Sequence, residues 1–325
     1  MILAGDVGGT KTLLGLFEPG PPLRPVRVAS FRSGDFPSLA AILEAFGAGA
    51  PGGVTAAALG VAGPVRGTTA VLPNLPWSVD GVALAAALGV PAVAILNDLE
   101  ATAWGLERLG DEALATLVPG APGATGNQAV LSAGTGLGEA VLVRAGAGRL
   151  ALASEGGHAD LAPRTDLEIE LLRWLRARHG RVSWERVLSG PGLASVHAFL
   201  AETGRGEEPP AVTAAIRAGD PAAEISAAAL EGRSARCALA LDLFAGVYGA
   251  EAGNLVLRAL ATGGLFLGGG IAPKILAWLR REPFRAAFLD KGRLSPLVAA
   301  TPVRVILDER AALLGAARVA AEGLR

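Results

Sequence analysis

The chain has 325 residues, of which 51% are hydrophobic, and its 29 basic and 30 acidic residues give a formal net charge of −1. That length predicts about two domains, and the hydrophobic content is enough for a sizeable core, so the composition argues against disorder. Nucleic acids and anionic membranes are bound by surfaces rich in basic residues, and the balanced charge gives no sign of one. We therefore expect neither as a partner.

The single cysteine, Cys237, excludes an internal disulfide and a zinc site built from CxxC pairs. It lies in an Ala/Leu-rich helical segment, which favours a buried and inert thiol. The N-terminus lacks the basic segment of a secretory signal, and the most apolar long stretch, residues 239–267, is interrupted by Asp242, Glu251 and Arg258. We expect a cytoplasmic protein without a membrane-spanning helix.

Apolar runs between turn residues predict the elements of the first half of the chain. Strands are expected at residues 2–7, 12–17, 26–31, 54–61, 67–72 and 91–96, and helices at 37–46, 79–88 and 99–109.

The second half repeats the opening pattern and then becomes mostly helical. Strands are expected at residues 128–132, 137–143, 265–267 and 303–307, and helices at 166–178, 191–200, from 221 onward with Asp220 as its N-cap, and 310–322. A strand, a Gly/Thr-rich turn and a second strand thus occur near the start of each half. We interpret this as an internal duplication.

The first of these turns lies in the sequence Gly5-Asp6-Val7-Gly8-Gly9-Thr10-Lys11-Thr12. It is not a P-loop, because Thr10 stands where the second glycine is needed and a strand follows instead of a helix. We expect Gly8 and Gly9 to adopt positive φ and offer backbone N–H groups to phosphate oxygens, while Thr10 and Lys11 add a hydroxyl and a positive charge. Asp6 is placed to hold a magnesium ion, directly or through water. Taken alone, an ordinary hairpin turn explains the pattern about as well.

A second turn, Gly134-Thr135-Gly136-Leu137-Gly138, favours the phosphate interpretation, because two such hairpins can hold a polyphosphate from two sides. The spacing is not that of a dinucleotide-binding motif, and no helix follows. A third run, Gly268-Gly269-Gly270, leaves room for a base and a ribose. In isolation it is almost as well explained as a strand-to-helix turn.

Polar residues that suit a sugar occur at three places. Asn97 and Asp98 follow an apolar strand, where α/β enzymes place chemistry, although an Asp that only caps a helix is the commoner outcome of such spacing. In Glu155-Gly156-Gly157-His158 the two glycines allow the acid and the histidine to turn toward one ligand. Glu185 alone would be read as a solvated glutamate at a helix start. His179 and His197 are interpreted as structural, and no histidine has the spacing of a metalloprotease site.

Taken together, these segments resemble the bacterial glucokinases of the hexokinase/actin-like superfamily over essentially the whole chain. The resemblance is carried, in this order, by Gly5-Asp6-Val7-Gly8-Gly9-Thr10, Leu96-Asn97-Asp98, Gly134-Thr135-Gly136-Leu137-Gly138, Glu155-Gly156-Gly157-His158, Glu185-Arg186-Val187-Leu188-Ser189-Gly190-Pro191-Gly192 and Gly268-Gly269-Gly270-Ile271.

The resemblance implies an α/β, two-domain actin-like (ribonuclease H-like) fold with a cleft between a small α/β domain and a larger helix-rich domain. Residues 1–108 with about 302–325 would form the small domain and residues 109–301 the large one. It implies a kinase that uses ATP and Mg2+ to phosphorylate D-glucose at the 6-hydroxyl, which feeds glycolysis, and it suggests a homodimer.

The resemblance also implies roles for single residues. Asp98 would be the catalytic base, and Asn97, Glu155, His158 and Glu185 would hold the glucose.

Two features depart from the family pattern. The related repressor/kinase group carries a cysteine-rich zinc motif after the Glu-x-x-His segment, and this chain has none. Glu139 occupies a position where a small apolar residue is more typical.

Three alternatives remain at this point. The first is a kinase for another hexose, such as mannose, fructose or an N-acetylated sugar. A sugar-responsive repressor would need a helix-turn-helix segment ahead of the first turn, which begins at residue 5. A filament-forming protein would have no use for the segment from Glu155 to His158.

Overall fold

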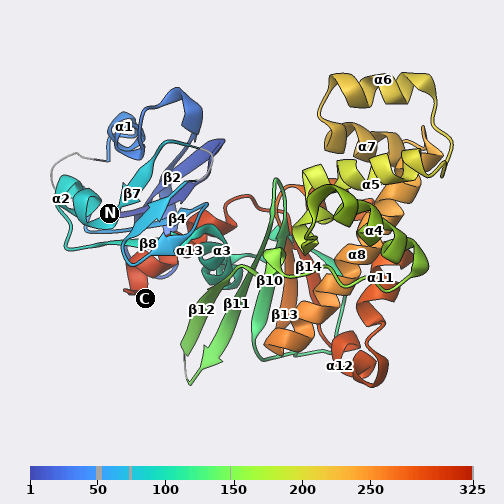
Figure 1. Cartoon of the computed structure of the whole chain (residues 1–325). Helices are drawn as coiled ribbons and strands as arrows, with labels where there is room; N and C mark the ends of the chain where they lie inside the picture. The colour runs from blue at the N-terminus through green and yellow to red at the C-terminus, as the bar shows by residue number, and fades with distance from the viewer. Residues whose placement is uncertain (49–52, 73–74, 147, 324–325) are drawn as a thin grey trace. The chain divides into compact units, whose positions relative to one another are not determined.

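The computed structural model describes residues 1–48, 53–72, 75–146 and 148–323 (Figure 1), so the last two residues of the expected small domain lie outside the described part. The chain forms two compact units. The first contains residues 1–113, 148–153 and 308–325, and the second contains residues 114–147 and 154–307.

The first unit is built on a sheet with the strand order β3-β2-β1-β4-β8. Its strands are β1 (Ile2–Val7), β2 (Lys11–Glu18), β3 (Arg24–Arg32), β4 (Ala56–Val61) and β8 (Val93–Asn97). The hairpins pair antiparallel, while β1, β4 and β8 run parallel. A small separate sheet contains β5 (Val65–Arg66), β6 (Thr69–Val71) and β7 (Ser78–Asp80).

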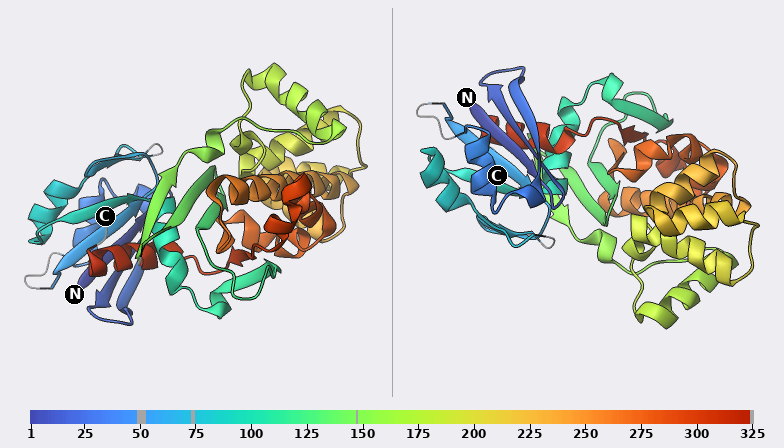
Figure 2. Two further views of the ribbon diagram at one scale, coloured as in Figure 1. Left: turned by 90° about the horizontal axis from the view of Figure 1, so that it is seen from below. Right: turned by 90° about the horizontal axis from the view of Figure 1, so that it is seen from above.

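Helices cover both faces of this sheet, which explains why its central strands are apolar along almost their whole length. On one face, α1 (Leu39–Ala45) and α2 (Gly81–Leu88) share a core with Leu3 and Leu59 of the sheet. Ser38 and Asp80 cap these two helices with side-chain oxygens. The helices α3 (Asp98–Gly105) and α13 (Ala311–Glu322) pack against each other, and α13 lies along β1 and β4 (Figure 2).

The second unit has a sheet in which β11, β10, β13, β14 and β9 are neighbours in that order. Their bounds are β9 (Leu114–Val118), β10 (Gln128–Ala133), β11 (Leu137–Ala145), β13 (Gly264–Gly268) and β14 (Val303–Ile306). Hydrogen bonds to β13 and β9 place β14 in this unit, whereas the expected boundary near residue 302 placed it in the small domain. The strand β12 (Gly148–Ser154) has residues 148–153 in the first unit.

The helices of the second unit pack around α8, whose middle is buried on every side. They are α4 (Asp166–His179), α5 (Gly190–Glu202), α6 (Pro210–Ala218), α7 (Pro221–Leu230), α8 (Ala235–Ala259), α9 (Ile271–Lys274), α10 (Leu276–Leu279), α11 (Glu282–Leu289) and α12 (Ser295–Ala299). Asp220 is the N-cap of α7, as expected. The hydroxyl of Tyr248 donates to the carbonyl oxygen of Leu131 at 3.1 Å, which ties α8 to β10.

The expected duplication is confirmed at the level of topology. In the first unit, β1 pairs antiparallel with β2 and parallel with β4, and β8 follows β4. In the second, β10 pairs antiparallel with β11 and parallel with β13, and β14 follows β13. Each unit therefore has one glycine-rich hairpin turn at the carboxyl edge of its parallel strands. Among the described residues, no helix combines the length and hydropathy needed to cross a bilayer.

A network of polar side chains joins the helices of the second unit around Glu208. The side chains of His197, Glu208 and Cys237 are of metal-ligating types, and their ligand atoms lie within 4.8 Å of one another. His197 Nε2 lies 2.6 Å from Glu208 Oε2, and the thiol of Cys237 donates to the same oxygen at 3.4 Å. Glu208 also accepts from Thr213, Ser234 and Arg236. Every one of these donors favours the ionised carboxylate, so the network satisfies its charge without a metal ion.

Burial opposes the charge of Glu208, but the hydrogen bonds from His197 and Thr213 outweigh it and lower the pKa of this carboxyl. A lowered pKa in the folded state stabilises the fold at pH values above the usual carboxyl range. Cys237 is buried, as expected, and burial raises the pKa of its thiol to about 11.

We predict that Glu208→Gln lowers the free energy of unfolding by about 2–3 kcal/mol at pH 7, since charge-assisted hydrogen bonds are lost. Urea denaturation measures this, with Glu207→Gln as the matched control, because Glu207 is the exposed neighbour. The difference should shrink as the pH falls through the folded-state pKa of Glu208, where protonation removes the same charge. Equal stability of the two variants at pH 7 would contradict the network's role.

Close packing of α3 against α13 gives a second prediction, Gly315→Ala. A Cβ at Gly315 would lie 1.7 Å from the carbonyl oxygen of Ala101, so the two helices would have to separate. We expect a loss of about 2–4 kcal/mol in the free energy of unfolding. The control is Gly34→Ala, where an added Cβ meets nothing within 4 Å. A Gly315→Ala protein that unfolds at the same temperature as Gly34→Ala would show that the helices are not closely packed.

Candidate functional site

In the first unit the carboxyl ends of three parallel strands meet at one edge of the sheet. Asp6 pairs with Gly60 of β4, and Val61 pairs with Asn97 at the end of β8. Asp6 and Asp98 consequently end at the same edge, two strands apart, and the negative charge of each acts on the other.

The side chain of Asp6 is in an unfavourable environment for a carboxylate. Burial raises its pKa to about 7, repulsion by Asp98 adds to the rise, and the attraction of Lys11 partly offsets it. Two acidic groups that converge at a strand edge form the kind of oxygen-rich environment that Mg2+ prefers, and a divalent cation would relieve their repulsion. The residues present therefore fit the magnesium ion expected from the sequence.

Asn97 and Asp98 are neighbours at the start of α3 but make different contacts. Asn97 is the N-cap, and its Oδ1 accepts from the backbone N–H groups of Leu99 at 3.0 Å and Glu100 at 3.4 Å. Its amide nitrogen donates to the carbonyl oxygen of Gly63 at 3.3 Å. The alternative in which Asp98 only caps the helix is therefore wrong. Asp98 is the first residue of the helix, half-buried, and its Oδ1 accepts from the backbone N–H of Leu99 at 3.0 Å.

The turn between β1 and β2 is held in place by a residue that sequence reasoning missed. Ser33 donates from its hydroxyl to the carbonyl oxygen of Gly8 at 2.7 Å and from its backbone N–H to Thr10 at 3.0 Å. The backbone N–H of Gly8 donates to the carbonyl oxygen of Lys11 at 3.0 Å, which closes the hairpin. Gly8 and Gly9 both belong to the described residues and neither has positive φ, so that expectation was wrong. The hairpin closes without a positive φ because the hydrogen bonds of the turn, and not left-handed residues, define the geometry of the turn.

Thr10 and Lys11 are exposed at this turn. The ammonium group of Lys11 lies 2.6 Å from a carboxylate oxygen of Glu309. Both side chains are largely exposed, so the ion pair contributes little and an anion can compete with it.

In the second unit, the turn between β10 and β11 is bound by the segment around Glu185. A carboxylate oxygen of Glu185 accepts from the backbone N–H of Leu137 at 3.0 Å, and the backbone N–H of Gly190 donates to the carbonyl oxygen of Gly134 at 2.9 Å. The hydroxyl of Ser189 donates to the carbonyl oxygen of Glu185 at 2.8 Å. Glu185 is thus attached to the glycine-rich turn and is not a solvated surface residue. Thr135, at the tip of the turn, is exposed, and an added Cβ at Gly134 would meet nothing within 4 Å.

Three of the residues expected to hold a sugar lie together. His158 Nε2 is 4.0 Å from a carboxylate oxygen of Glu155, and His158 Nδ1 is 4.0 Å from one of Glu185. The side chains of Glu155 and His158 are 75% and 55% exposed, so both can reach a ligand from solvent. The three residues come from the short 3₁₀ segments η4 (Gly156–His158) and η5 (Trp184–Arg186) and the residue before η4. A backbone hydrogen bond from Trp184 to Ala159 at 3.0 Å holds the two segments side by side.

The third glycine run lies at the same edge of this sheet. Gly268 pairs with Ser132 at the end of β10, next to the Gly134–Gly136 turn. Gly269 has a φ of +80°, and a Cβ there would lie 2.3 Å from the carbonyl oxygen of Ala133, so only glycine fits. An added Cβ at Gly270 meets nothing within 4 Å. Both glycine-rich segments therefore face the same side of the second unit, as a bound nucleotide would require.

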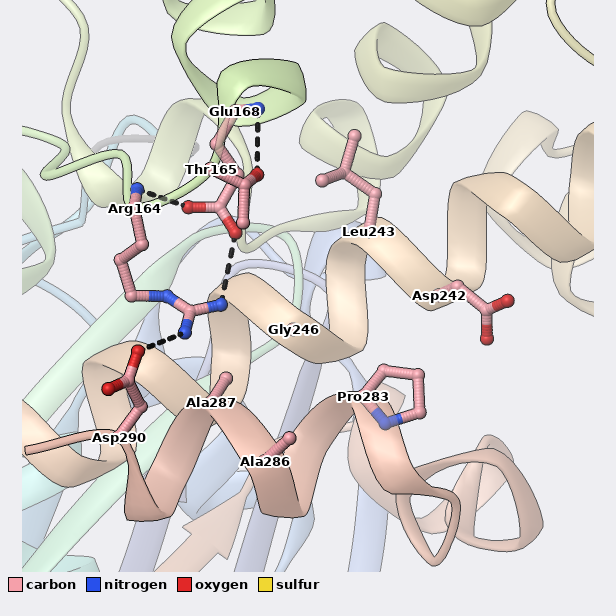
Figure 3. A pocket seen from close by; sticks show the side chains of 10 residues that line it. All are labelled: Arg164, Thr165, Glu168, Asp242, Leu243, Gly246, Pro283, Ala286, Ala287 and Asp290. Carbon is pink, nitrogen blue, oxygen red and sulfur yellow. Dashed lines mark hydrogen bonds and ion pairs between the residues drawn. The ribbon is translucent and has the colours of Figure 1, made fainter. Parts of the chain in front are cut away.

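A pocket of about 480 Å³ lies elsewhere in the second unit, between the start of α4, α8 and α11 (Figure 3). Arg164 crosses it and binds Glu168 at 3.1 Å and Asp290 at 3.4 Å, as the dashed lines in Figure 3 mark. None of the residues expected to bind sugar or nucleotide lines this pocket. It therefore takes no part in the candidate site.

The comparisons with known proteins agree with this geometry. The glucokinase family model matches residues 3–323. The glucokinases of Nostoc sp. and Synechocystis sp. are each 41% identical to the chain, over 99% of both chains for the first and 98% of both for the second. A crystal structure of a glucokinase from an Antarctic psychrotroph superposes with a TM-score of 0.84 at 32% identity and covers 99% of this chain and 98% of its own. A glucokinase of the ROK family from Streptomyces griseus has a TM-score of 0.65 at 24% identity over 99% of both chains, a likeness of fold. The matches of the actin-like two-domain fold and of the full-length sequence lead to one conclusion: the chain belongs to the glucokinase family.

Proposed function

We propose that the chain transfers the terminal phosphoryl group of ATP to the 6-hydroxyl of D-glucose, with Asp98 as the catalytic base and Mg2+ near Asp6. Phosphorylation of glucose follows from membership of the family. The observation that supports the residue roles best is that Asp6 and Asp98 end at the same strand edge of the first unit, where Asn97 is the N-cap of α3 and Asp98 is its first residue.

In this mechanism Asp98 accepts the proton of the 6-hydroxyl while that oxygen attacks the terminal phosphorus. The bond to the bridging oxygen of ADP breaks on the opposite side, and ADP leaves with the electron pair. Such transition states are loose, so positioning and charge neutralisation supply most of the rate. A half-buried carboxylate at a helix start is well suited to accept a proton when the hydroxyl is held against it.

Glu155, His158 and Glu185 are proposed to hold the hexose, with Asn97 contributing from the first unit. Carboxylate oxygens accept from sugar hydroxyls, and His158 can donate or accept at either ring nitrogen. Support comes from the 4.0 Å separations that bring the three side chains together. Among the structural neighbours, the glucokinases of Balamuthia mandrillaris and Streptomyces griseus are described as complexes with glucose.

The glycine-rich turns are proposed to bind the triphosphate and the nucleoside. Gly8, Gly9, Thr10 and Lys11 would contact phosphate oxygens, as would the turn Gly134-Thr135-Gly136, and Gly268-Gly269-Gly270 would leave space for the base and ribose. The Streptomyces griseus structure contains AMPPNP, an ATP analogue. When bound, Mg2+ would neutralise phosphate charge. We further propose that the protein is cytoplasmic and acts as a homodimer.

The role of Asp98 is tested by Asp98→Asn. We expect kcat to fall by about a hundredfold to ten-thousandfold, because the amide cannot accept the proton, while glucose still binds. A coupled assay for ADP gives kcat, and calorimetry gives the Kd for glucose. Asp111→Asn, an exposed site in the same unit, is the control. Turnover of Asp98→Asn within a factor of three of the control would exclude Asp98 as the base.

The role of Asp6 is tested by the magnesium dependence of Asp6→Asn. Removing the carboxylate should raise the Mg2+ concentration needed for half-maximal rate by about tenfold, with the KM for glucose little changed. The assay varies free Mg2+ at saturating ATP and glucose. An unchanged magnesium dependence would show that Asp6 does not serve the ion.

A further inference from the structure

Glu139 follows the second glycine-rich turn, on β11, and its carboxyl group is buried directly beneath the segment proposed to hold the hexose. The residue is 2% exposed. A Cβ at Gly156 would lie 2.1 Å from Glu139 Oε2, so the backbone at Gly156 passes over the carboxyl group with no space between them. The next residue is equally close to the strand, since a Cβ at Gly157 would lie 2.0 Å from the carbonyl oxygen of Leu137. The two glycines before His158 thus allow η4 to rest on β11.

Below this contact, Glu139 meets two charged residues of α8. Arg258 donates to Glu139 Oε2 at 3.3 Å and also binds Glu251, which is fully buried. Glu251 further accepts from the amide of Asn254 at 3.0 Å. Among the described residues, Glu139 Oε1 is buried without a hydrogen-bond partner. Lys291 also interacts electrostatically with Glu251.

Within hydrogen-bond reach the two carboxylates share one guanidinium group, that of Arg258, while Lys291 acts on Glu251 through its charge. Burial raises the pKa of Glu139 to about 8, repulsion by Glu251 adds to the rise, and Arg258 partly offsets it. These surroundings therefore favour the protonated form of Glu139. When Glu139 is ionised, the cluster gains a second buried negative charge under Gly156.

We propose that Glu139 is a positioning residue for the hexose-binding segment from Glu155 to His158, which it supports from below and connects through Arg258 to α8. The neutral carboxyl group packs against the backbone of Gly156 and thereby sets the distance between this segment and β11. Ionised Glu139 disturbs that support. The inference rests on the proposed role of Glu155 and His158, and it explains why a glutamate stands where an apolar residue is more typical of the family.

The experiment compares wild type, Glu139→Ala and Glu139→Gln at pH 7 and pH 9. Glu139→Ala removes the support, and its KM for glucose should rise by about fivefold to twentyfold while kcat and the KM for ATP stay within about twofold. Glu139→Gln is neutral and of the same shape, so its KM for glucose should stay within about twofold of wild type at pH 7. The KM of the wild type should rise between pH 7 and pH 9, and that of Glu139→Gln should stay flat.

Two results would overturn the inference. One is a folded Glu139→Ala protein whose KM for glucose equals that of the wild type. The other is a Glu139→Gln protein whose KM rises with pH as steeply as that of the wild type. The second comparison decides the matter even if Glu139→Ala does not fold. Glu282→Gln, on an exposed face of the same unit, controls for general effects of losing an acid.

Two more variants separate this inference from the function on which it rests. If His158→Ala leaves the KM for glucose unchanged, the proposed hexose site itself fails; if it raises the KM and Glu139→Ala does not, only the role of Glu139 fails. The contact is tested by Gly156→Ala, which should raise the KM for glucose because its new methyl group meets Glu139 Oε2. Adding Glu139→Ala should recover part of that loss. If the fold-changes in KM caused by the two single substitutions simply multiply in the double variant, the two residues do not touch.

Discussion

The parallel pairing of three strands in each unit is the constraint on which the rest of the structure depends. Parallel strands end at the same edge of a sheet, so residues about 90 positions apart in the chain, Asp6 and Asp98, come within electrostatic reach. The same geometry in the second unit places the Gly134–Gly136 turn beside Gly269. Because both units repeat one hairpin-plus-parallel-strand topology, each has a glycine-rich turn at the edge where its candidate site residues lie.

Both units also contain carboxyl groups whose ionisation is opposed by burial or by a neighbouring negative charge. The two units compensate for this in different ways. Asp6 and Asp98 repel each other at the carboxyl edge of the first sheet, an arrangement that suits a cation and a proton acceptor. Glu139 and Glu251 are buried beneath the backbone of Gly156, where Arg258 binds both of them and the pKa of Glu139 is raised. In our proposals the first arrangement serves the reaction, and the second positions the residues that would hold the substrate. The Glu208 network is a third arrangement, in which donors alone satisfy the charge.

Local sequence signals predicted most of what is local in the structure. The two hairpins, the cap at Asp220 and the long apolar strands follow from turn residues and periodicity over a few positions. The site segments were found because motifs of several residues carry the family resemblance. The strands β9 and β12 were missed: β9 is short, and its partner β14 lies almost 190 residues further along the chain. No local pattern reveals such a partner.

The roles of single side chains at the site were harder to predict for the same reason. Asn97, and not Asp98, is the N-cap of α3. Which of two adjacent polar residues becomes the cap depends on their backbone angles, and the sequence alone does not give these angles. Ser33 supports the first turn from 25 residues away, and Glu139 meets Arg258 across 119 residues. Glu139 stood out in the sequence only as a departure from the family pattern, and its partners could be identified only from the fold.

The most direct test of the account is a crystal structure of the protein with glucose and a non-hydrolysable ATP analogue. The account predicts a carboxylate oxygen of Asp98 at about 2.6–3.2 Å from the glucose 6-hydroxyl, with Glu155 and His158 on the other hydroxyls of the same sugar. A complex in which glucose is bound with its 6-hydroxyl directed away from Asp98 would contradict it.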